Sequence, residues 1–84
     1  MRVVASSHFL RRARKLTPPR DELLRAALRR FEANPQDPLL RTHKLKGDLA
    51  DYWAFSVDDD VRVLFRWDGD VCFLAALGTH DEIY

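Results

Sequence analysis

The sequence lacks several features that would place it in a specialised class of protein. Its one cysteine, Cys72, cannot form an internal disulfide and has no partner for a CxxC metal or redox motif. The longest apolar run, Val71–Leu77, is far shorter than the roughly 18 residues that a membrane span needs. Basic residues crowd the only N-terminal stretch that might serve as the apolar core of a signal peptide. We therefore expect a cytoplasmic protein with no membrane association.

Motifs for cofactor and metal binding are also missing. The chain has no glycine-rich phosphate loop, no nucleophile elbow and no cysteine–histidine pair. The three consecutive acids Asp58–Asp60 match no known ligand spacing, and we interpret them as turn formers. No cofactor and no metal ion are therefore expected.

Length and charge give the first positive information. A chain of 84 residues has room for one domain, residues 1–84, with a small core. Residues 1–47 carry twelve Lys and Arg against four Asp and Glu, whereas residues 48–84 carry two against nine. A basic half of this size can attract nucleic acid or an acidic protein partner. The alternative is that the basic residues only form the solvated faces of two helices, and composition leaves both open.

The N-terminal half has the pattern of one strand and two helices. Residues 2–5 are short and β-branched, as in a strand, and Ser6 or Ser7 can cap the helix that follows. Pro18 and Pro19 end that helix and begin a second one, because proline fits only the first turn of a helix. The second helix carries an apolar stripe and ends at Asn34. The two amphipathic helices are expected to form a hairpin.

The C-terminal half has the period of two that is typical of strands. Residues 38–47 predict an ordered loop or short edge strand, and the Asp68–Gly69 pair predicts a tight hairpin turn. Strands are predicted at residues 52–57, 61–67 and 71–77. The order is β-α-α-β-β-β, an α+β fold with the helix hairpin packed on one face of a small, curved, mostly antiparallel sheet. The other face stays partly open, and we expect the functional site there.

The polar residues of this half include the groups that RNA cleavage requires. His43 or Asp60 is a candidate base for the ribose 2′-hydroxyl, and His80 is a candidate acid for the leaving 5′-oxygen. Arg62 and Arg66 lie four residues apart on one predicted strand, so they share a face and can hold phosphate. The alternative is a solvent-facing arginine pair balanced by the aspartates of the adjacent turn.

Four segments together resemble the RelE/ParE toxin superfamily, and most closely its YafQ-like branch. They are His43–Gly47, Tyr52–Val57, Asp60–Phe65 and Leu77–Tyr84. The resemblance covers essentially the whole chain. It implies the toxin of a type II toxin–antitoxin pair, an endoribonuclease that cleaves mRNA on the ribosome without a metal. It also implies a cognate antitoxin that silences the toxin in a hetero-oligomer.

The resemblance also implies residue roles. The catalytic positions are His43, Asp60, Arg62, His80 and Tyr84. Basic residues near them would bind RNA or the ribosome without reading its sequence, namely Arg41, Lys44, Lys46 and Arg66.

This chain differs from its relatives at some positions. YafQ-like toxins are expected to have a histidine at Ser56, an aromatic residue at Val61 and an arginine at Ala76, and RelE has lysines at Trp53 and Phe55. Two alternatives therefore stay open. One is a ParE-like toxin that binds DNA gyrase and cleaves nothing. The other is a weakly active member of the superfamily that only binds a partner.

Overall fold

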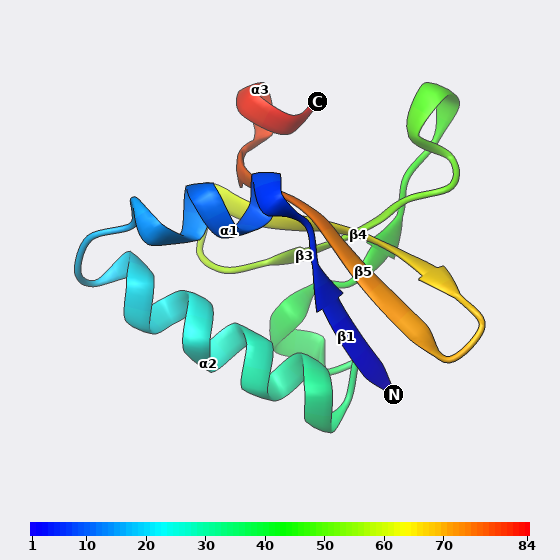
Figure 1. Ribbon diagram of the computed structural model, residues 1–84, viewed down its shortest axis with the longest axis horizontal. Helices are drawn as coiled ribbons and strands as arrows, with labels where there is room; N and C mark the ends of the chain where they lie inside the picture. Colours follow the sequence, from blue (N-terminus) through cyan, green and yellow to red (C-terminus); the bar gives the residue numbers. More distant parts are fainter.

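A computed structural model describes all residues of the chain, 1–84, and has the expected α+β architecture (Figure 1). Helices α1 and α2 pack against a five-stranded sheet, and a short third helix follows the last strand. In chain order the elements are β1 Arg2–Ala5, α1 Ser7–Arg14, α2 Arg20–Ala33, the 3-10 helix η1 Pro38–Leu40, β2 His43–Lys44, the 3-10 helix η2 Gly47–Leu49, β3 Trp53–Ser56, β4 Val61–Asp68, β5 Val71–Thr79 and α3 His80–Ile83.

The sheet is mixed, with the strand order β1-β5-β4-β3-β2. Strand β1 pairs with β5 in parallel, and the other three pairings are antiparallel. Strands β4 and β5 lie inside the sheet, whereas the edges are β1 and the two-residue strand β2. Short edge strands of this kind limit unwanted pairing with other chains. The predicted mostly antiparallel sheet is confirmed.

Helix α1 begins where the sequence predicts, at the cap residue Ser6. The Ser6 hydroxyl oxygen accepts a hydrogen bond from the backbone N–H of Phe9 at 3.0 Å, which satisfies one of the free N–H groups of the first turn. The same hydroxyl donates to the backbone carbonyl of Ala75 at 2.8 Å. Ser6 therefore both starts α1 and ties this end of the helix to β5.

The core lies between the helix hairpin and one face of the sheet. Phe31 of α2 is fully buried, and its ring lies 4.7 Å from that of Phe55 and 4.8 Å from that of Phe65. Aromatic pairs at these distances are favourable beyond the area that they bury. The cluster has twelve buried residues, which are Phe9, Leu24, Ala27, Phe31, Leu40, Phe55, Val61, Val63, Phe65, Cys72, Leu74 and Leu77.

A β-bulge in β5 brings two core residues of that strand to one face at an odd spacing. Leu64 of β4 pairs with Ala76 and the next residue, Phe65, pairs with Leu74, so Ala75 is an extra residue in β5. An extra residue shifts the alternation of side chains by one position. Leu74 and Leu77 are therefore both buried in the core although they lie three residues apart. The sequence pattern alone did not predict this irregularity.

The structure departs from the predicted elements at a few positions. The predicted edge segment, residues 38–47, contains η1 and β2, and η2 begins at its last residue, Gly47. Helix α3 was not predicted because it has only four residues. Asp68 pairs with Val71, so the hairpin loop consists of Gly69 and Asp70, one residue later than predicted. Gly69 has a φ of +58°, which glycine adopts at little cost. No helix has both the length and the apolar character needed to cross a membrane.

Candidate functional site

Helix α3 carries two of the predicted site residues, His80 and Tyr84, at its two ends. Thr79 is the N-cap, and its backbone N–H donates to the Glu82 carboxylate at 2.8 Å. This is one half of a capping box, which stabilises the start of a helix. The Tyr84 ring packs edge-on against the His80 ring, with 4.5 Å between the two centroids. The short helix therefore holds the two side chains together.

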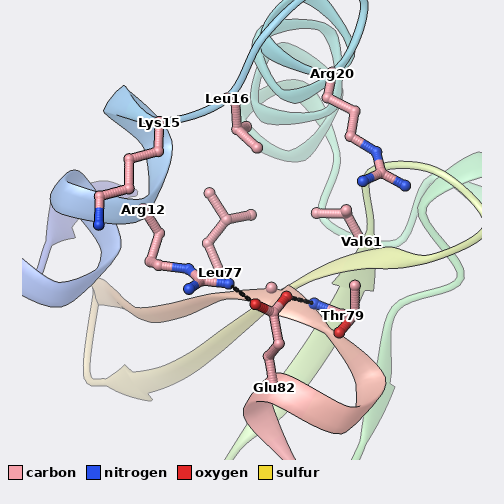
Figure 2. Close-up of a pocket in the computed structure, with 9 residues that line it drawn as sticks. Arg12, Lys15, Leu16, Arg20, Val61, Leu77, Thr79 and Glu82 are labelled. Carbon is pink, nitrogen blue, oxygen red and sulfur yellow. Dashed lines mark hydrogen bonds and ion pairs between the residues drawn. The ribbon is translucent and has the colours of Figure 1, made fainter.

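Contacts with α1 and β5 fix the position of α3. Figure 2 shows Glu82 between Arg12 of α1, with which it forms an ion pair, and the backbone of Thr79. The Thr79 N–H and the Arg12 guanidinium lower the pKa of Glu82 to about 2. A Cβ atom on Gly78 would lie 3.1 Å from the Glu82 side chain. Because only glycine leaves this space free, α3 can fold back closely against the end of β5.

Residues that make these contacts, Arg12, Gly78, Thr79 and Glu82, also line a pocket of about 280 Å³ between α1, α2 and the ends of β4 and β5. Its lining is basic, with Arg12 and Lys15 on one side and Arg20 on the other (Figure 2). Arg12 is paired with Glu82, and Arg20 is paired with Asp58 at 3.0 Å. Since two of its three cations are already neutralised, we assign this pocket the role of a support for α3.

Arg62 projects from β4 on the face of the sheet that the helix hairpin leaves uncovered. Its cross-strand neighbours are Gly78 on β5 and Ser56 on β3, and both are small. Arg62 has no carboxylate partner among the ion pairs of the structure. An unpaired guanidinium with space around it is well suited to bind a phosphate in bidentate fashion.

His43 reaches the same face from the edge strand β2, where it pairs with Ala54. Its Nδ1 lies 2.9 Å from the backbone carbonyl oxygen of Arg41. A carbonyl can only accept a hydrogen bond, so Nδ1 is the protonated nitrogen. In the neutral ring Nε2 then has a free lone pair. Nε2 is therefore the nitrogen of His43 that can take a proton from a substrate.

His43, Arg62, His80 and Tyr84 line one pocket of about 390 Å³. In Figure 1, the segment around η2 and helix α3 both project from the sheet on the side away from α2. The remaining wall of the pocket comes from the segment between β2 and η2, and its residues are Leu45, Lys46 and Leu49. Four of the five predicted catalytic residues, which are up to 41 positions apart in the sequence, therefore meet at one place.

Asp60, the fifth of these residues, lies outside that pocket. It lines a neighbouring pocket of about 320 Å³ in which Arg62 and His80 also take part. The Asp60 carboxylate accepts a hydrogen bond from Arg20 at 3.3 Å. Of the two candidate bases, His43 faces the pocket of Arg62, His80 and Tyr84, whereas Asp60 lies beyond Arg62 and is paired with a helix arginine.

The four predicted RNA-binding residues are spread over the surface. Lys46 lines the pocket, but the neighbouring strand position Lys44 points to the other side of the sheet from His43. Arg41 lies next to Asp59, with 3.8 Å between the charged groups. Arg66 is about 13 Å from Arg62 along the strand, given about 3.3 Å per residue. Arg62 and Arg66 line different pockets.

Burial affects one ionisable group in the pocket. It raises the pKa of Tyr84 above its usual value, although the nearby Arg62 guanidinium acts in the opposite direction. The hydroxyl of Tyr84 therefore keeps its proton at neutral pH and can donate a hydrogen bond. No three His, Cys, Asp or Glu side chains in the molecule lie close enough to share a metal ion.

Several features of the site were not found from the sequence. The apolar wall formed by Leu45 and Leu49 lies in a segment without periodicity, so nothing indicated its position. The ion pair between Arg12 and Glu82 joins residues 70 positions apart. The sequence did contain a signal for the start of α3, since Thr79 and Glu82 have the spacing of a capping box.

The positions that differ from the resembling toxins divide between the two faces of the sheet. Ser56 and Ala76 pair with Arg62 and Leu64 on the uncovered face. Phe55 belongs to the buried core and Trp53 packs against it. The two positions that hold lysines in RelE are therefore used here for core packing.

Comparison with solved structures identifies similar folds. YafQ from E. coli strain BL21(DE3) has a TM-score of 0.81 and 17% sequence identity, with coverage of 100% of this chain and 99% of that chain. The YoeB/ParE toxin from Agrobacterium tumefaciens has a TM-score of 0.78 and 20% identity, and coverage is 95% and 99%. YoeB in the YoeB-YefM complex from Staphylococcus aureus has a TM-score of 0.76 and 14% identity, with coverage of 95% and 97%.

Sequence comparison adds nothing to this result, since no protein-family model and no curated protein matches the chain. The structural matches nevertheless extend over nearly the whole length of both chains. They agree with the order of elements and with the sheet described above. The chain has the α+β fold of the RelE/YafQ/YoeB type of toxin.

Proposed function

We propose that this protein is the toxin of a type II toxin–antitoxin pair and that it cleaves mRNA on the ribosome. The observation that carries the proposal is the pocket in which His43, Arg62, His80 and Tyr84 meet on the uncovered face of the sheet. These side chains supply a base, a cation and an acid, which are the groups that phosphodiester cleavage needs. The fold shared with YafQ and YoeB supports the same function.

In the proposed reaction His43 is the general base. Its Nδ1–H is held by the carbonyl oxygen of Arg41, so Nε2 is free to take the proton from the ribose 2′-hydroxyl. The 2′-oxygen then attacks the adjacent phosphorus, and the bond from phosphorus to the 5′-oxygen breaks. The products are a 2′,3′-cyclic phosphate and a 5′-hydroxyl end.

In the same step, Arg62 acts on the phosphate and His80 acts on the leaving 5′-oxygen. The unpaired guanidinium of Arg62 stabilises the negative charge that develops on the phosphate. Protonated His80 donates its proton to the leaving 5′-oxygen. Tyr84 packs against the His80 ring and keeps its hydroxyl proton, so it orients the acid and can donate a hydrogen bond to the phosphate.

The proposal requires the ribosome and mRNA as partners and places the protein in the cytoplasm. Lys46 at the rim of the pocket and Arg41 on the nearby surface would attract the RNA backbone, and Lys44 would do so from the other side of strand β2. Contacts of this kind give affinity for RNA without sequence preference and weaken as salt is added.

The proposal also includes a cognate antitoxin. One of the structural neighbours, YoeB, is part of a complex with YefM. The first 47 residues of this chain have an excess of eight positive charges. An acidic segment that is disordered alone can fold onto such a surface and cover a pocket beside it. We expect the two proteins to co-purify as a hetero-oligomer that dissociates at high salt.

The test compares the wild type with His80→Ala and His43→Ala in a purified translation system with mRNA. The control is His8→Ala, which changes an exposed histidine of α1 that lines no pocket near the site. Wild type and control should produce new 5′-hydroxyl ends within codons on the ribosome. Loss of a general acid or base typically lowers the rate about 10²- to 10⁴-fold.

Two results would contradict the proposal. One is intact mRNA on translating ribosomes with the wild-type protein. The other is growth arrest in cells that persists in His80→Ala without mRNA cleavage, which would favour a gyrase-binding toxin. Equal loss of activity in the His8→Ala control would show that the effect of the other variants is not specific.

A further inference from the structure

A second pocket on the sheet lies beyond the proposed cleavage site along β4. It has a volume of about 400 Å³ and is lined by Asp51, Tyr52, Arg66 and Trp67. This volume falls in the range of about 300 to 1,000 Å³ that is usual for ligand sites. Nothing in the cleavage mechanism described above uses it.

Arg66 connects this pocket to the cleavage site. Arg62 and Arg66 alternate with Leu64 on the same strand face, and neither arginine has a carboxylate partner. They are about 13 Å apart at about 3.3 Å per residue. A single strand of RNA covers that distance in a few nucleotides. The two free guanidinium groups therefore mark a line along which a phosphate backbone can run.

Two aromatic residues, Phe73 and Tyr52, lie beside Arg66 on the same face of the sheet. The Arg66 guanidinium lies 5.1 Å from the centre of the Phe73 ring, a distance that allows a cation–π contact. Tyr52 directly precedes β3, so the antiparallel register places it next to Arg66. Trp67 also lines the pocket and is 37% exposed, but its ring lies on the helix side of the sheet, where it packs against Phe31 and Phe65. Flat groups of this kind, combined with positive charge, are how proteins stack the bases of single-stranded RNA.

We propose that the Asp51–Tyr52–Arg66–Trp67 pocket is a second RNA subsite, which holds a nucleobase a few nucleotides away from the phosphate at Arg62. This inference rests on the proposed function, because that function supplies the RNA strand. Asp51 is exposed at the rim and can accept a hydrogen bond from the amino group of a base. Adenine, cytosine and guanine have such a group and uracil does not. The subsite therefore favours the first three bases.

The first test measures binding of 2′-O-methyl RNA octamers, which lack the 2′-hydroxyl and are not cleaved. Removing one stacked base contact in Tyr52→Ala or Arg66→Gln should weaken binding about 5- to 150-fold. Tyr52→Phe keeps the ring and should bind like the wild type. Arg30→Gln, an exposed arginine of α2, is the matched control for charge.

The second test concerns the choice of base. Wild type should bind oligo(C) and oligo(A) more tightly than oligo(U), and Asp51→Asn should reduce that preference. Asp48→Asn is the matched control, because Asp48 is an exposed acid of the same loop but does not line the pocket. On ribosomes, the same two variants should differ in the base found at a fixed distance from the cut.

The outcomes separate this inference from the proposed function. If the wild type cleaves mRNA but the Tyr52, Arg66 and Asp51 variants neither weaken octamer binding nor change the base preference, the subsite is overturned and the cleavage proposal stands. If the wild type cleaves nothing but binds octamers in a way that depends on Tyr52 and Arg66, the subsite stands alone. If it neither cleaves mRNA nor binds any octamer, both are overturned.

Discussion

The two faces of the sheet differ in the burial and the charge of their side chains. On the face under the helices, Phe31, Phe55 and Phe65 are fully buried and contact one another. On the other face Arg62 and Arg66 have no ion-pair partner, and His43 is exposed. The core contains no buried polar side chain. One face is thus built for stability and the other for contact with a charged ligand, and substitutions should separate the two roles.

The largest effect on stability is expected from the covered face. Phe31→Ala removes the ring at the centre of the aromatic cluster and should lower the free energy of unfolding by about 3–5 kcal/mol. That is a large part of the roughly 5–15 kcal/mol available to a domain. Urea denaturation followed by tryptophan fluorescence measures it. Leu39→Ala is the control, since Leu39 is 68% exposed and should change stability by less than about 0.5 kcal/mol. Similar losses in both variants would contradict the central role of Phe31.

A smaller effect on stability, with a larger one on activity, is expected where the two faces meet at α3. Gly78→Ala places a methyl group 3.1 Å from the Glu82 side chain and 3.3 Å from Ile83, so these two residues of α3 must shift by a few tenths of an ångström. The cost in stability should be about 1–3 kcal/mol. A movement of His80 and Tyr84 with this shift should lower the cleavage rate, by less than the roughly 100-fold loss that a misplacement of about 1 Å can cause. Thermal unfolding and the cleavage assay measure the two effects. Unchanged cleavage would show that the position of α3 is not important for the site.

The smallest effect is expected from pH and concerns the turn before β4. Burial alone would raise the pKa of Asp58, but hydrogen bonds from the N–H groups of Val61 and Asp60 and from Arg20 lower it below 3.8. A carboxyl with a lowered pKa in the folded state stabilises the fold above its unfolded pKa of about 3.9. That contribution is lost as the pH falls through the lower, folded pKa.

The measurement is the free energy of unfolding between pH 6 and pH 2 for the wild type and Asp58→Asn. Glu82 has a pKa of about 2, so it contributes equally in both proteins to the fall of the free energy of unfolding with falling pH. The variant should lose the part that comes from Asp58, which is on the order of 1 kcal/mol for a partly exposed pair. Asp59→Asn is the control, because Asp59 is almost fully exposed. If the free energy of unfolding changes with pH equally in the wild type and in Asp58→Asn, Asp58 does not contribute to the pH dependence.

Much of the fold could be predicted because its signals are local. The cap at Ser6, the prolines at residues 18 and 19 and the alternation of residues 61–67 each depend on neighbours in the chain. The predicted β-α-α-β-β-β series is confirmed for this reason, and the structure adds the two-residue edge strand β2 and the short helix α3 to it. Helix α3 is too short for its sequence to show helical periodicity. The bulge at Ala75 shifts which side chains of β5 face the core, and the apolar sequence of β5 contains no residue that indicates this shift.

The candidate site was predictable as a set of residue types but not as an arrangement. The sequence singled out His43, Asp60, Arg62 and His80 by their chemistry and by resemblance. It did not separate Asp60 from the others, because the choice depends on Arg20, which is 40 positions away. Nor did it show that Arg66 belongs to a different pocket from Arg62, since side-chain alternation places both on the same face.

The sequence by itself determined the two long helices and the three long strands β3 to β5, the asymmetry of charge and the set of reactive side chains. These properties depend on residues that are neighbours in the chain, within the reach of a helical turn or a strand repeat. Only the tertiary structure decided which side chains meet. The parallel pairing of β1 with β5 and the ion pair of Arg12 with Glu82 close long loops of chain. Long-range contacts of this kind place His80 and Tyr84 beside His43 and Arg62. No local sequence pattern indicates these contacts.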